Sequence, residues 1–317
     1  MTSARARHIG TLAVSALVIA AIVWRVDPRR VTRDFEGVHW GWVIATALLN
    51  IANTWLEAVR WRLLAKPVAP HARVSSTFYG LLVGTVANVV MPFKLGDGAR
   101  AYVLAEDEDI PFAAAVSTVV LDRMLDVASF VALAALTIPF APLPAREIEA
   151  IAGLAIAIGV LFAALAWGRR RDPAAAPRTG RIAAQYDRFW EGLAALQTGH
   201  LLGPAFAISV VSWILRFVFV WTMFQAFDLS LPLAACAVLQ VVINVGIAVV
   251  GTPGNIGSFE LACMGGLALF GVPGDVAFSF GAALHVTEVA PVVALGLIMM
   301  WAGPARAGRG PLGRSSG

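Results

Sequence analysis

The sequence predicts an all-α polytopic membrane protein with about six full spans and two broken, re-entrant hairpins, arranged as two inverted-topology repeats. Hydrophobic residues make up 59% of its 317 residues and charged residues only 14%, whereas a soluble domain carries roughly 25% charged residues. The mean hydropathy is +0.76. Two similar helix-breaking motifs also interrupt apolar segments in the two halves of the chain. Such matched breaks are typical of transporters built from inverted repeats.

The two motifs share their order and spacing. The first reads Met-Pro-Phe-Lys-Leu-Gly-Asp-Gly-Ala-Arg over residues 91–100, and the second reads Thr-Pro-Gly-Asn-Ile-Gly-Ser-Phe-Glu over residues 252–260. In each motif a glycine stands four residues after a proline, and an acidic residue follows the glycine. The expected bends of the two hairpins are Pro92, Gly96, Pro253, Gly254 and Gly257.

Six apolar segments have about the length that a membrane-spanning helix requires, which is about 20 residues. Tryptophans at several segment ends suit the membrane–water interface. The first segment is expected to stay uncleaved, because no small-residue cleavage site follows Trp24. The six segments are residues 9–24, 40–64, 111–140, 151–167, 201–227 and 275–301.

Two further pairs of apolar segments form the predicted hairpins. Residues 74–91 would cover about 27 Å as a helix, but residues 94–105 would cover only about 18 Å and cannot cross a bilayer. The second pair is residues 231–250 and 256–270. Unpaired backbone inside a membrane is tolerated only beside protein or a polar cavity. We therefore expect re-entrant hairpins at 74–105 and 231–270.

These elements divide the chain into four parts. The first repeat is expected over residues 1–168, with a helix boundary near residue 150, and the second over residues 201–303. Between them, residues 169–200 form a basic cytoplasmic linker with an amphipathic helix, and residues 304–317 form a basic, disordered tail. Basic loops favour the cytoplasmic side. This predicts a multi-pass protein of a bacterial-type inner (plasma) membrane with both termini in the cytoplasm.

Ionisable residues inside the apolar zone indicate a binding site. Each charge facing lipid would cost about 2.5–3.5 kcal/mol, and ten would cost on the order of 25–35 kcal/mol. These side chains must therefore face one another or a hydrated cavity, and we expect them to bind substrate. The ten residues are Lys94, Asp97, Arg100, Asp122, Arg123, Asp126, Arg216, Glu260, His285 and Glu288.

A simpler explanation is that some of these residues form ion pairs that only hold helices together. The pairs that sequence spacing suggests are Asp97 with Arg100, Arg123 with Asp126, and His285 with Glu288. The last of these pairs would also suit a protonation switch. Four polar residues on one face of the 40–64 segment, namely Asn50, Asn53, Glu57 and Arg60, would either line the cavity or join helices.

Other kinds of site are not indicated. Cys236 and Cys263 lie in apolar surroundings and read as packing residues. We see no metal-ligand spacing, no nucleophile motif and no nucleotide-binding glycine loop, so neither a metal nor another cofactor is expected. No basic patch with interleaved aromatic residues indicates a nucleic-acid partner.

The motifs resemble the lysylphosphatidylglycerol synthase transmembrane-region family, also called the flippase-like domain family. Residues 88–100, 122–126 and 253–260 carry the resemblance. Lys94 and Asp97 keep the charges of the Arg and Glu that are usual in the family, Asp122 replaces a Glu, and His285 stands where many members have an Arg. The chain is expected to be a stand-alone member, since its 317 residues include no aminoacyl-transferase domain.

The resemblance implies a lipid flippase or transporter rather than an enzyme. Its cargo would be a lipid with a polar or charged headgroup, of the aminoacyl-phospholipid, hopanoid or polyprenyl-phosphate type. Lys94, Arg100, Arg123 and Arg216 would contact a phosphate, and the acidic residues would balance them or carry protons. An integral-membrane enzyme of envelope biosynthesis and a non-catalytic scaffold stay open as alternatives. Besides the membrane lipid, a homodimer partner or an envelope-biosynthesis enzyme also stays open.

Overall fold

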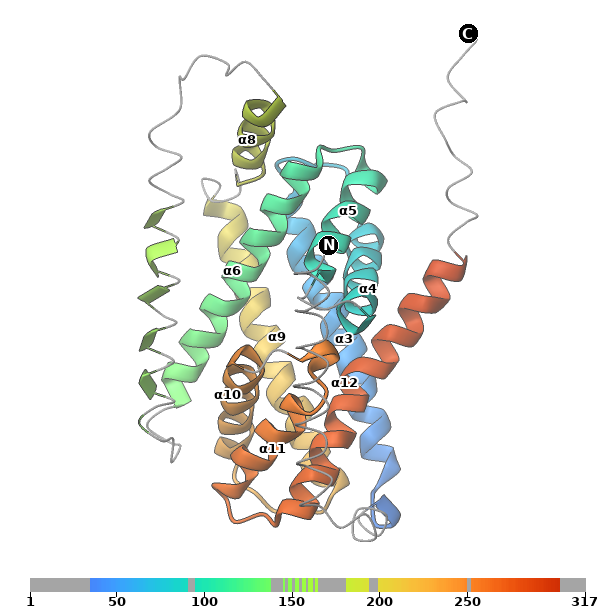
Figure 1. The fold of residues 1–317 in the computed structure, drawn as a ribbon, viewed down its shortest axis with the longest axis vertical. Coiled ribbons are helices and arrows are strands. Elements are labelled where there is room, and N and C mark those ends of the chain that lie inside the picture. Colours follow the sequence, from blue (N-terminus) through green and yellow to red (C-terminus); the bar gives the residue numbers. More distant parts are fainter. Residues whose placement is uncertain are drawn as a thin grey trace, which may run out of the picture.

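The computed structural model describes residues 35–90, 95–137, 181–193, 199–249 and 252–302, together with isolated positions between 145 and 164. Within these residues every regular element is helical (Figure 1). The predicted span at 9–24, the bend residue Pro92, the site residue Lys94 and the tail at 304–317 lie outside the described residues, as do many positions of the predicted span at 151–167. The elements are α3 Trp40–Ala65, α4 Val74–Val90, α5 Gly96–Glu108, α6 Phe112–Thr137, α8 Arg181–Gly192, α9 Gly199–Ala226, α10 Leu233–Val249, η4 Pro253–Asn255, α11 Ser258–Ala268 and α12 Gly274–Ala302.

Several helices have the length and composition of membrane-embedded segments. Among the described residues, three are long and apolar enough to cross a bilayer: Trp40–Ala65, His200–Ala226 and Gly274–Trp301. Shorter apolar helices occupy both predicted hairpins. The 26-residue α6 also has the length of a span, but charged side chains lie near its middle. The protein is therefore an all-helical membrane protein.

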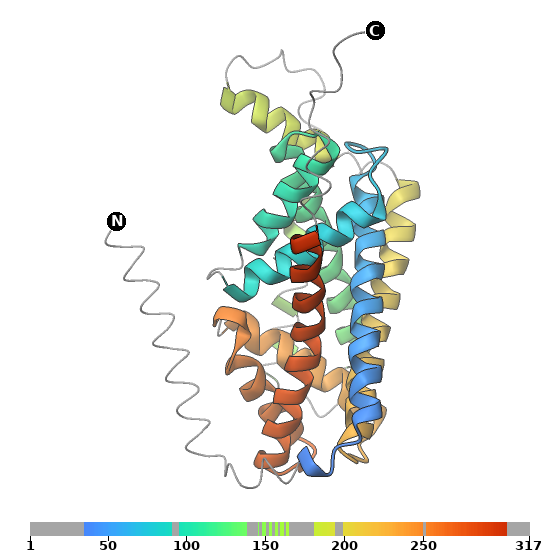
Figure 2. The same ribbon diagram turned by 90° about the vertical axis from the view of Figure 1, so that its right-hand side faces the viewer.

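The long helices form the frame on which the short ones pack. Helices α3 and α9 run side by side along the bundle (Figure 2), and α12 runs obliquely to them (Figure 1). Helices α4 and α5 pack against each other in one half of the bundle, and α10 and α11 pack against each other in the other half (Figure 1). The short helix η4 contacts α4. The second predicted bend thus lies against the helix that precedes the first.

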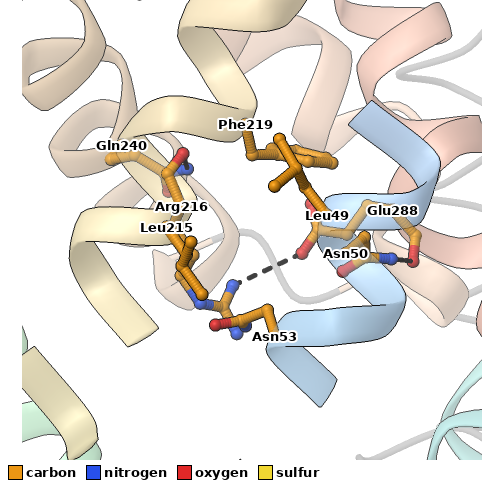
Figure 3. Close-up of a pocket in the computed structure, with 8 residues that line it drawn as sticks. All are labelled: Leu49, Asn50, Asn53, Leu215, Arg216, Phe219, Gln240 and Glu288. Atoms are coloured by element: carbon orange, nitrogen blue, oxygen red, sulfur yellow. Dashed lines mark hydrogen bonds and ion pairs between the residues drawn. The ribbon is translucent and has the colours of Figure 1, made fainter. Parts of the chain in front are cut away.

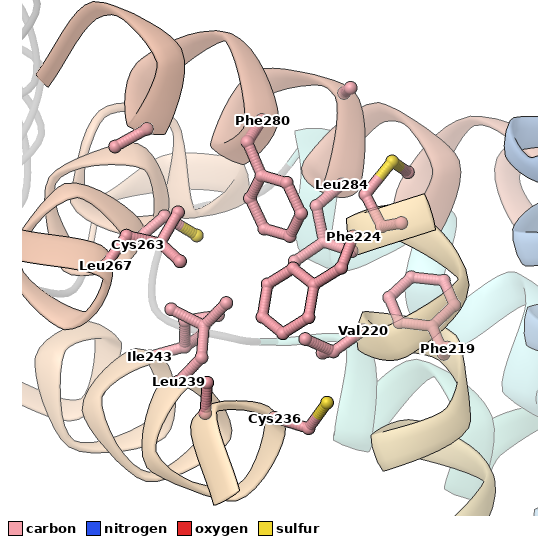
Figure 4. Packing of buried hydrophobic residues seen from close by; sticks show 14 of the residues in the cluster. Phe219, Val220, Phe224, Cys236, Leu239, Ile243, Cys263, Leu267, Phe280 and Leu284 are labelled. Atoms are coloured by element: carbon pink, nitrogen blue, oxygen red, sulfur yellow. The ribbon is translucent and has the colours of Figure 1, made fainter. Parts of the chain in front are cut away.

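Each half has its own apolar core. In the second half, Phe224 of α9 and Phe280 of α12 pack with ring centroids 5.3 Å apart, and both cysteines are buried in the same cluster (Figure 4). In the first half, the core centres on Trp61 of α3 and includes Leu82 of α4. Inside a bilayer such cores are stabilised by close packing between helices, because lipid tails are as apolar as the side chains.

The predicted amphipathic helix of the linker is present as α8. It packs against α6, and its last residue Gly192 and the following Leu193 are buried. Tyr186 remains exposed. The apolar face of α8 is therefore covered at least in part by the protein itself.

Candidate functional site

The polar face of α3 separates two groups of ionic side chains. Toward the end of the helix, Arg60 contacts carboxylates of α6. One turn earlier, Glu57 accepts a hydrogen bond from Arg216 of α9 at 2.7 Å and another from Asn53 at 2.9 Å. Asn50, two turns before Glu57, donates to the backbone carbonyl of Glu288 at 2.6 Å. Because these residues recur at the helical spacing of α3, one face of this helix contacts both groups.

The first group, which we call the arginine–aspartate cluster, is held together by ion pairs among its own members, although the buried Arg100 Nε has no hydrogen-bond partner. Asp122 accepts from Arg60 at 2.8 Å and from Arg100 at 3.1 Å. Asp126 accepts from Arg60 at 2.9 Å. Asp97 lies 3.2 Å from Arg100 and 2.7 Å from Arg123. Three arginines and three aspartates thus balance in formal charge, so the cluster holds no uncompensated charge for a ligand.

Two of the ion pairs suggested by sequence spacing are wrong, and one is present. Asp97 does pair with Arg100. Arg123 pairs with Asp97 rather than with Asp126, because the short α5 brings Asp97 across to α6. His285 pairs with Glu260 rather than with Glu288, because α11 packs along α12.

The second group surrounds two small cavities between α3, α9, α10 and α12. Arg216 lies 2.7 Å from Glu57 and 3.7 Å from Glu288, and its guanidinium carbon lies 5.1 Å from the ring centroid of Trp213. Arg216 Nε is buried and has no hydrogen-bond partner. Figure 3 shows Arg216 and Glu288 facing each other across the first cavity, with Asn50, Asn53 and Gln240 around them.

The second cavity lies beside the loop that joins α10 to α11. It has a volume of about 60 Å³ and is lined by Arg216, Asn244, Asn255, His285 and Glu288 among others. A water molecule needs about 10–15 Å³ in this measure. The cavity therefore has room for a few waters but not for a lipid headgroup.

The loop beside this cavity is the second predicted bend. Gly254 has φ 61° and Gly257 has φ 85°, which are left-handed conformations that glycine adopts without a steric penalty. Asn255 between them has φ 58°. Thr252 and Ser258 hydrogen-bond to each other across the loop at 3.0 Å. A Cβ atom on Gly254 would lie 3.9 Å from the Val89 carbonyl oxygen at the end of α4.

The structure therefore distributes the predicted site residues among separate environments. The expectation that all of them share one hydrated chamber is not met, because the residues of the arginine–aspartate cluster pair with one another and line neither of the two cavities, although Asp97 and Arg123 stay partly exposed. Arg216, His285 and Glu288 line the second cavity, and Glu260 lies behind His285. Lys94 lies outside the described residues. The clustered ones are Asp97, Arg100, Asp122, Arg123 and Asp126.

Several polar residues of the site were absent from the sequence-predicted set. Glu57 and Arg60 hold charges of opposite sign on α3, and their helical spacing had signalled a polar face. Gln240 and Asn244 line the second cavity from α10. They stand four residues apart in an otherwise apolar segment, which is a recognisable signal for one helix face. In the described part of the chain, no group of three His, Cys, Asp or Glu side chains could hold a metal ion.

The fold and the site together define an α-helical integral membrane protein that keeps a network of paired charges inside an apolar bundle. Residues 9–296 match the family model of the lysylphosphatidylglycerol synthase TM region, so the chain belongs to that family. The resemblance drawn from the motifs is thereby confirmed. A membrane location and a lipid-related role follow from the family.

Several proteins are similar to this chain, two of them named as membrane proteins. A UPF0104 membrane protein of Methanothermobacter thermautotrophicus is 22% identical over 307 residues, covering 89% of each chain. Another, of Methanocaldococcus jannaschii, is 31% identical over 121 residues, which are 38% of this chain and 36% of that protein. Glycosyltransferase AglD of Haloferax volcanii is 22% identical over 130 residues, covering 41% of this chain but only 21% of that protein. No solved structure matches.

Proposed function

We propose that this protein moves a lipid with a polar or charged headgroup between the leaflets of the membrane. The headgroup passes along the polar surfaces of α3, α9 and α12, while the acyl chains stay in the bilayer. The observation that carries the proposal is Arg216, which lines both cavities together with Glu288 and keeps a buried Nε without a partner.

The charge distribution supports this choice of residues. The arginine–aspartate cluster is compensated internally and serves as a structural anchor. Arg100 of that cluster also has a buried Nε without a partner, but only Arg216 of the two lines both cavities, and it reaches Glu288 only at 3.7 Å, which is too long for a direct hydrogen bond. An unsatisfied buried donor costs about 1–3 kcal/mol, and an oxygen atom of a passing headgroup would satisfy it. Glu288 offers the matching acceptor for a cationic or hydroxyl-bearing group.

The architecture supports a transport mechanism with two inverted repeats. We infer that α4–α5 and α10–α11 are equivalent re-entrant hairpins that enter from opposite sides. The contact of η4 with α4 and the small volume of the adjoining cavity, about 60 Å³, fit a closed state. Passage of a headgroup then requires the hairpins to separate, as in alternating access.

The test is translocation in proteoliposomes with headgroup-labelled lipids of the three candidate types: aminoacyl phospholipid, hopanoid and polyprenyl phosphate. Arg216→Gln and Glu288→Gln should each slow the transfer of the true cargo at least about tenfold, the effect of losing one charge-assisted hydrogen bond of about 1.5–3 kcal/mol. Lys66→Gln is the matched control, because it removes a charge at the end of α3 away from both cavities. Translocation of no lipid class, or full activity of Arg216→Gln, would contradict the proposal.

A role in an enzymatic step is the second candidate, favoured by the partial likeness to a protein named glycosyltransferase. In that case the purified protein should form product from a lipid-linked acceptor and a sugar donor without moving lipid. If the protein is only a scaffold, the double variant Arg216→Gln, Glu288→Gln should restore growth of a deletion strain as well as the wild type does.

A further inference from the structure

Both ring nitrogens of His285 face hydrogen-bond acceptors. Nδ1 lies 2.7 Å from Glu260 Oε1, and Nε2 lies 3.0 Å from the carbonyl oxygen of Gly254. A carbonyl oxygen and an ionised carboxylate can only accept, and a neutral imidazole has a single N–H. Neutral His285 can therefore donate to one of these partners but not to both.

One additional proton on the pair satisfies both contacts. Either an imidazolium donates from both nitrogens, or a protonated Glu260 donates to Nδ1 while Nε2–H donates to Gly254. In both cases the other oxygen of Glu260 accepts from the N–H of Gly257 at 2.7 Å. The observed geometry thus requires a proton that ionised Glu260 and neutral His285 together do not carry.

The same pair connects the loop between α10 and α11 to the rest of the bundle. His285 stands on α12, so its bond to Gly254 ties the loop to a different helix. The ring is also fixed from one side by Phe259, which stacks on it at 4.5 Å between centroids. Asn255 of this loop lines the second cavity, as Arg216 does. Loss of the bond to Gly254 would therefore allow the loop that lines this cavity to move.

We propose that Glu260 and His285 form a proton-binding site that latches the second hairpin. With the extra proton bound, the loop is held against α12 and the cavity is closed. When the proton leaves for cavity water, the ring keeps one N–H for the stronger acceptor, the Glu260 carboxylate, and the bond to Gly254 is lost. The latch itself does not depend on transport, but its use to couple proton release to lipid passage rests on the proposed function.

Among the residues that the structure describes, the other ionisable groups around the pair are few. Glu288 on α12 and Arg216 on α9 share the cavity with His285, and Glu57 of α3 contacts Arg216. Cys263 of α11 is fully buried. From α10 the neighbours are the uncharged amides Gln240 and Asn244. All of these stay unchanged in the variants below.

Two substitutions in the pair have opposite expected effects. In Glu260→Gln the amide nitrogen donates to Nδ1, the amide oxygen accepts from Gly257 N–H, and Nε2–H donates to Gly254. This variant keeps every bond without a titratable proton and imitates the latched state. In His285→Gln both N–H donors are on one nitrogen, so the side chain cannot donate to Glu260 and to the Gly254 carbonyl oxygen at the same time. This variant therefore imitates the released state.

The test is hydrogen–deuterium exchange of the full-length protein in nanodiscs, with protection corrected for intrinsic exchange rates. In the wild type, protection of residues 252–260 should fall about fivefold to tenfold as the pH rises from about 5 to about 9. Glu260→Gln should keep the high protection at every pH, and His285→Gln should show the low protection at every pH. Residues 96–108 of α5 serve as the internal reference and should not change.

Wild-type protection of the loop that does not vary with pH would overturn the latch. So would loss of protection in Glu260→Gln as large as that in His285→Gln, because that is the result of a merely structural pair. Translocation is measured separately. If loop protection depends on pH but the protein moves no lipid, the latch is supported and the transport function is refuted. If the protein moves lipid but loop protection does not depend on pH, the transport function is supported and the latch is refuted.

Discussion

At the scale of single residues, Arg60 shows how a charged side chain is accommodated inside this apolar bundle. Its side chain is only 2% exposed and is held by Asp122, Asp126 and the hydroxyl of Ser209. A buried ion pair gains little net stability, but removing one partner leaves an uncompensated charge in an apolar medium. Removing one carboxylate from the cluster should therefore destabilise the protein by more than the whole ion pair stabilises it.

Asp122→Asn should destabilise the protein strongly, because both Arg60 and Arg100 then lose a buried carboxylate. The expected loss in free energy of unfolding is about 3–5 kcal/mol. Unfolding in mixed micelles with increasing SDS, followed by tryptophan fluorescence, measures it.

Asp97→Asn is the matched comparison, because Asp97 is 36% exposed, its closest partner Arg123 is half-exposed, and its other partner, the buried Arg100, keeps the carboxylate of Asp122. Its cost should stay below about 1 kcal/mol, as for solvent-screened pairs. Equal losses for the two variants would show that burial does not govern the cluster.

At the scale of elements, the hairpin of α4 and α5 is built on close backbone approach. A Cβ atom on Gly96 would collide with the carbonyl oxygen of Gly84, and one on Gly84 would lie 2.9 Å from the carbonyl oxygen of Gly96. The N–H of Gly96 also donates to the side chain of Asn88 at 2.8 Å. Small residues of this kind let membrane helices pack without a hydrophobic driving force.

Gly96→Ala should separate α4 from α5 and lower stability by about 1–3 kcal/mol, the usual cost of overpacking. Gly98→Ala on the same helix is the control, because a Cβ there meets nothing within 4 Å. It should be neutral or stabilising by about 0.5–1 kcal/mol. Thermal aggregation of the detergent-solubilised proteins compares them, and an equal effect of both alanines would refute the backbone contact.

At the scale of the whole molecule, α3 and α9 join the two halves. The loop between α3 and α4 lies at one end of the bundle, and the loop between α9 and α10 lies at the other (Figure 1). At this second end, His39 lies 3.1 Å from Asp228, so the start of α3 is beside the end of α9. A bilayer across the bundle would therefore separate the two loops.

Cysteines placed in these loops should be labelled from opposite sides of the membrane. We expect His71→Cys to react with a membrane-impermeant maleimide only in inverted vesicles and Ser230→Cys only in intact cells. Both positions are exposed, whereas the native Cys236 and Cys263 are buried and serve as the unreactive background. Labelling of both from one side would contradict the predicted topology.

The sequence alone predicted the class of protein and the bounds of several of its helices. Apolar length fixes where a membrane helix can lie, so the predicted segments agree with α3, α4, α9 and α12 to within a few residues. It also placed the bend at Gly254 and Gly257, because left-handed backbone favours glycine. The family followed from the same motifs.

Only the tertiary structure decided which charges meet. Sequence spacing paired His285 with Glu288 and Arg123 with Asp126, which are neighbours on one helix face. The actual partners, Glu260 and Asp97, stand on other helices. Periodicity describes the face of a single helix, but the partner of a buried charge depends on which helices pack together and at what height. That information exists only once the chain is folded.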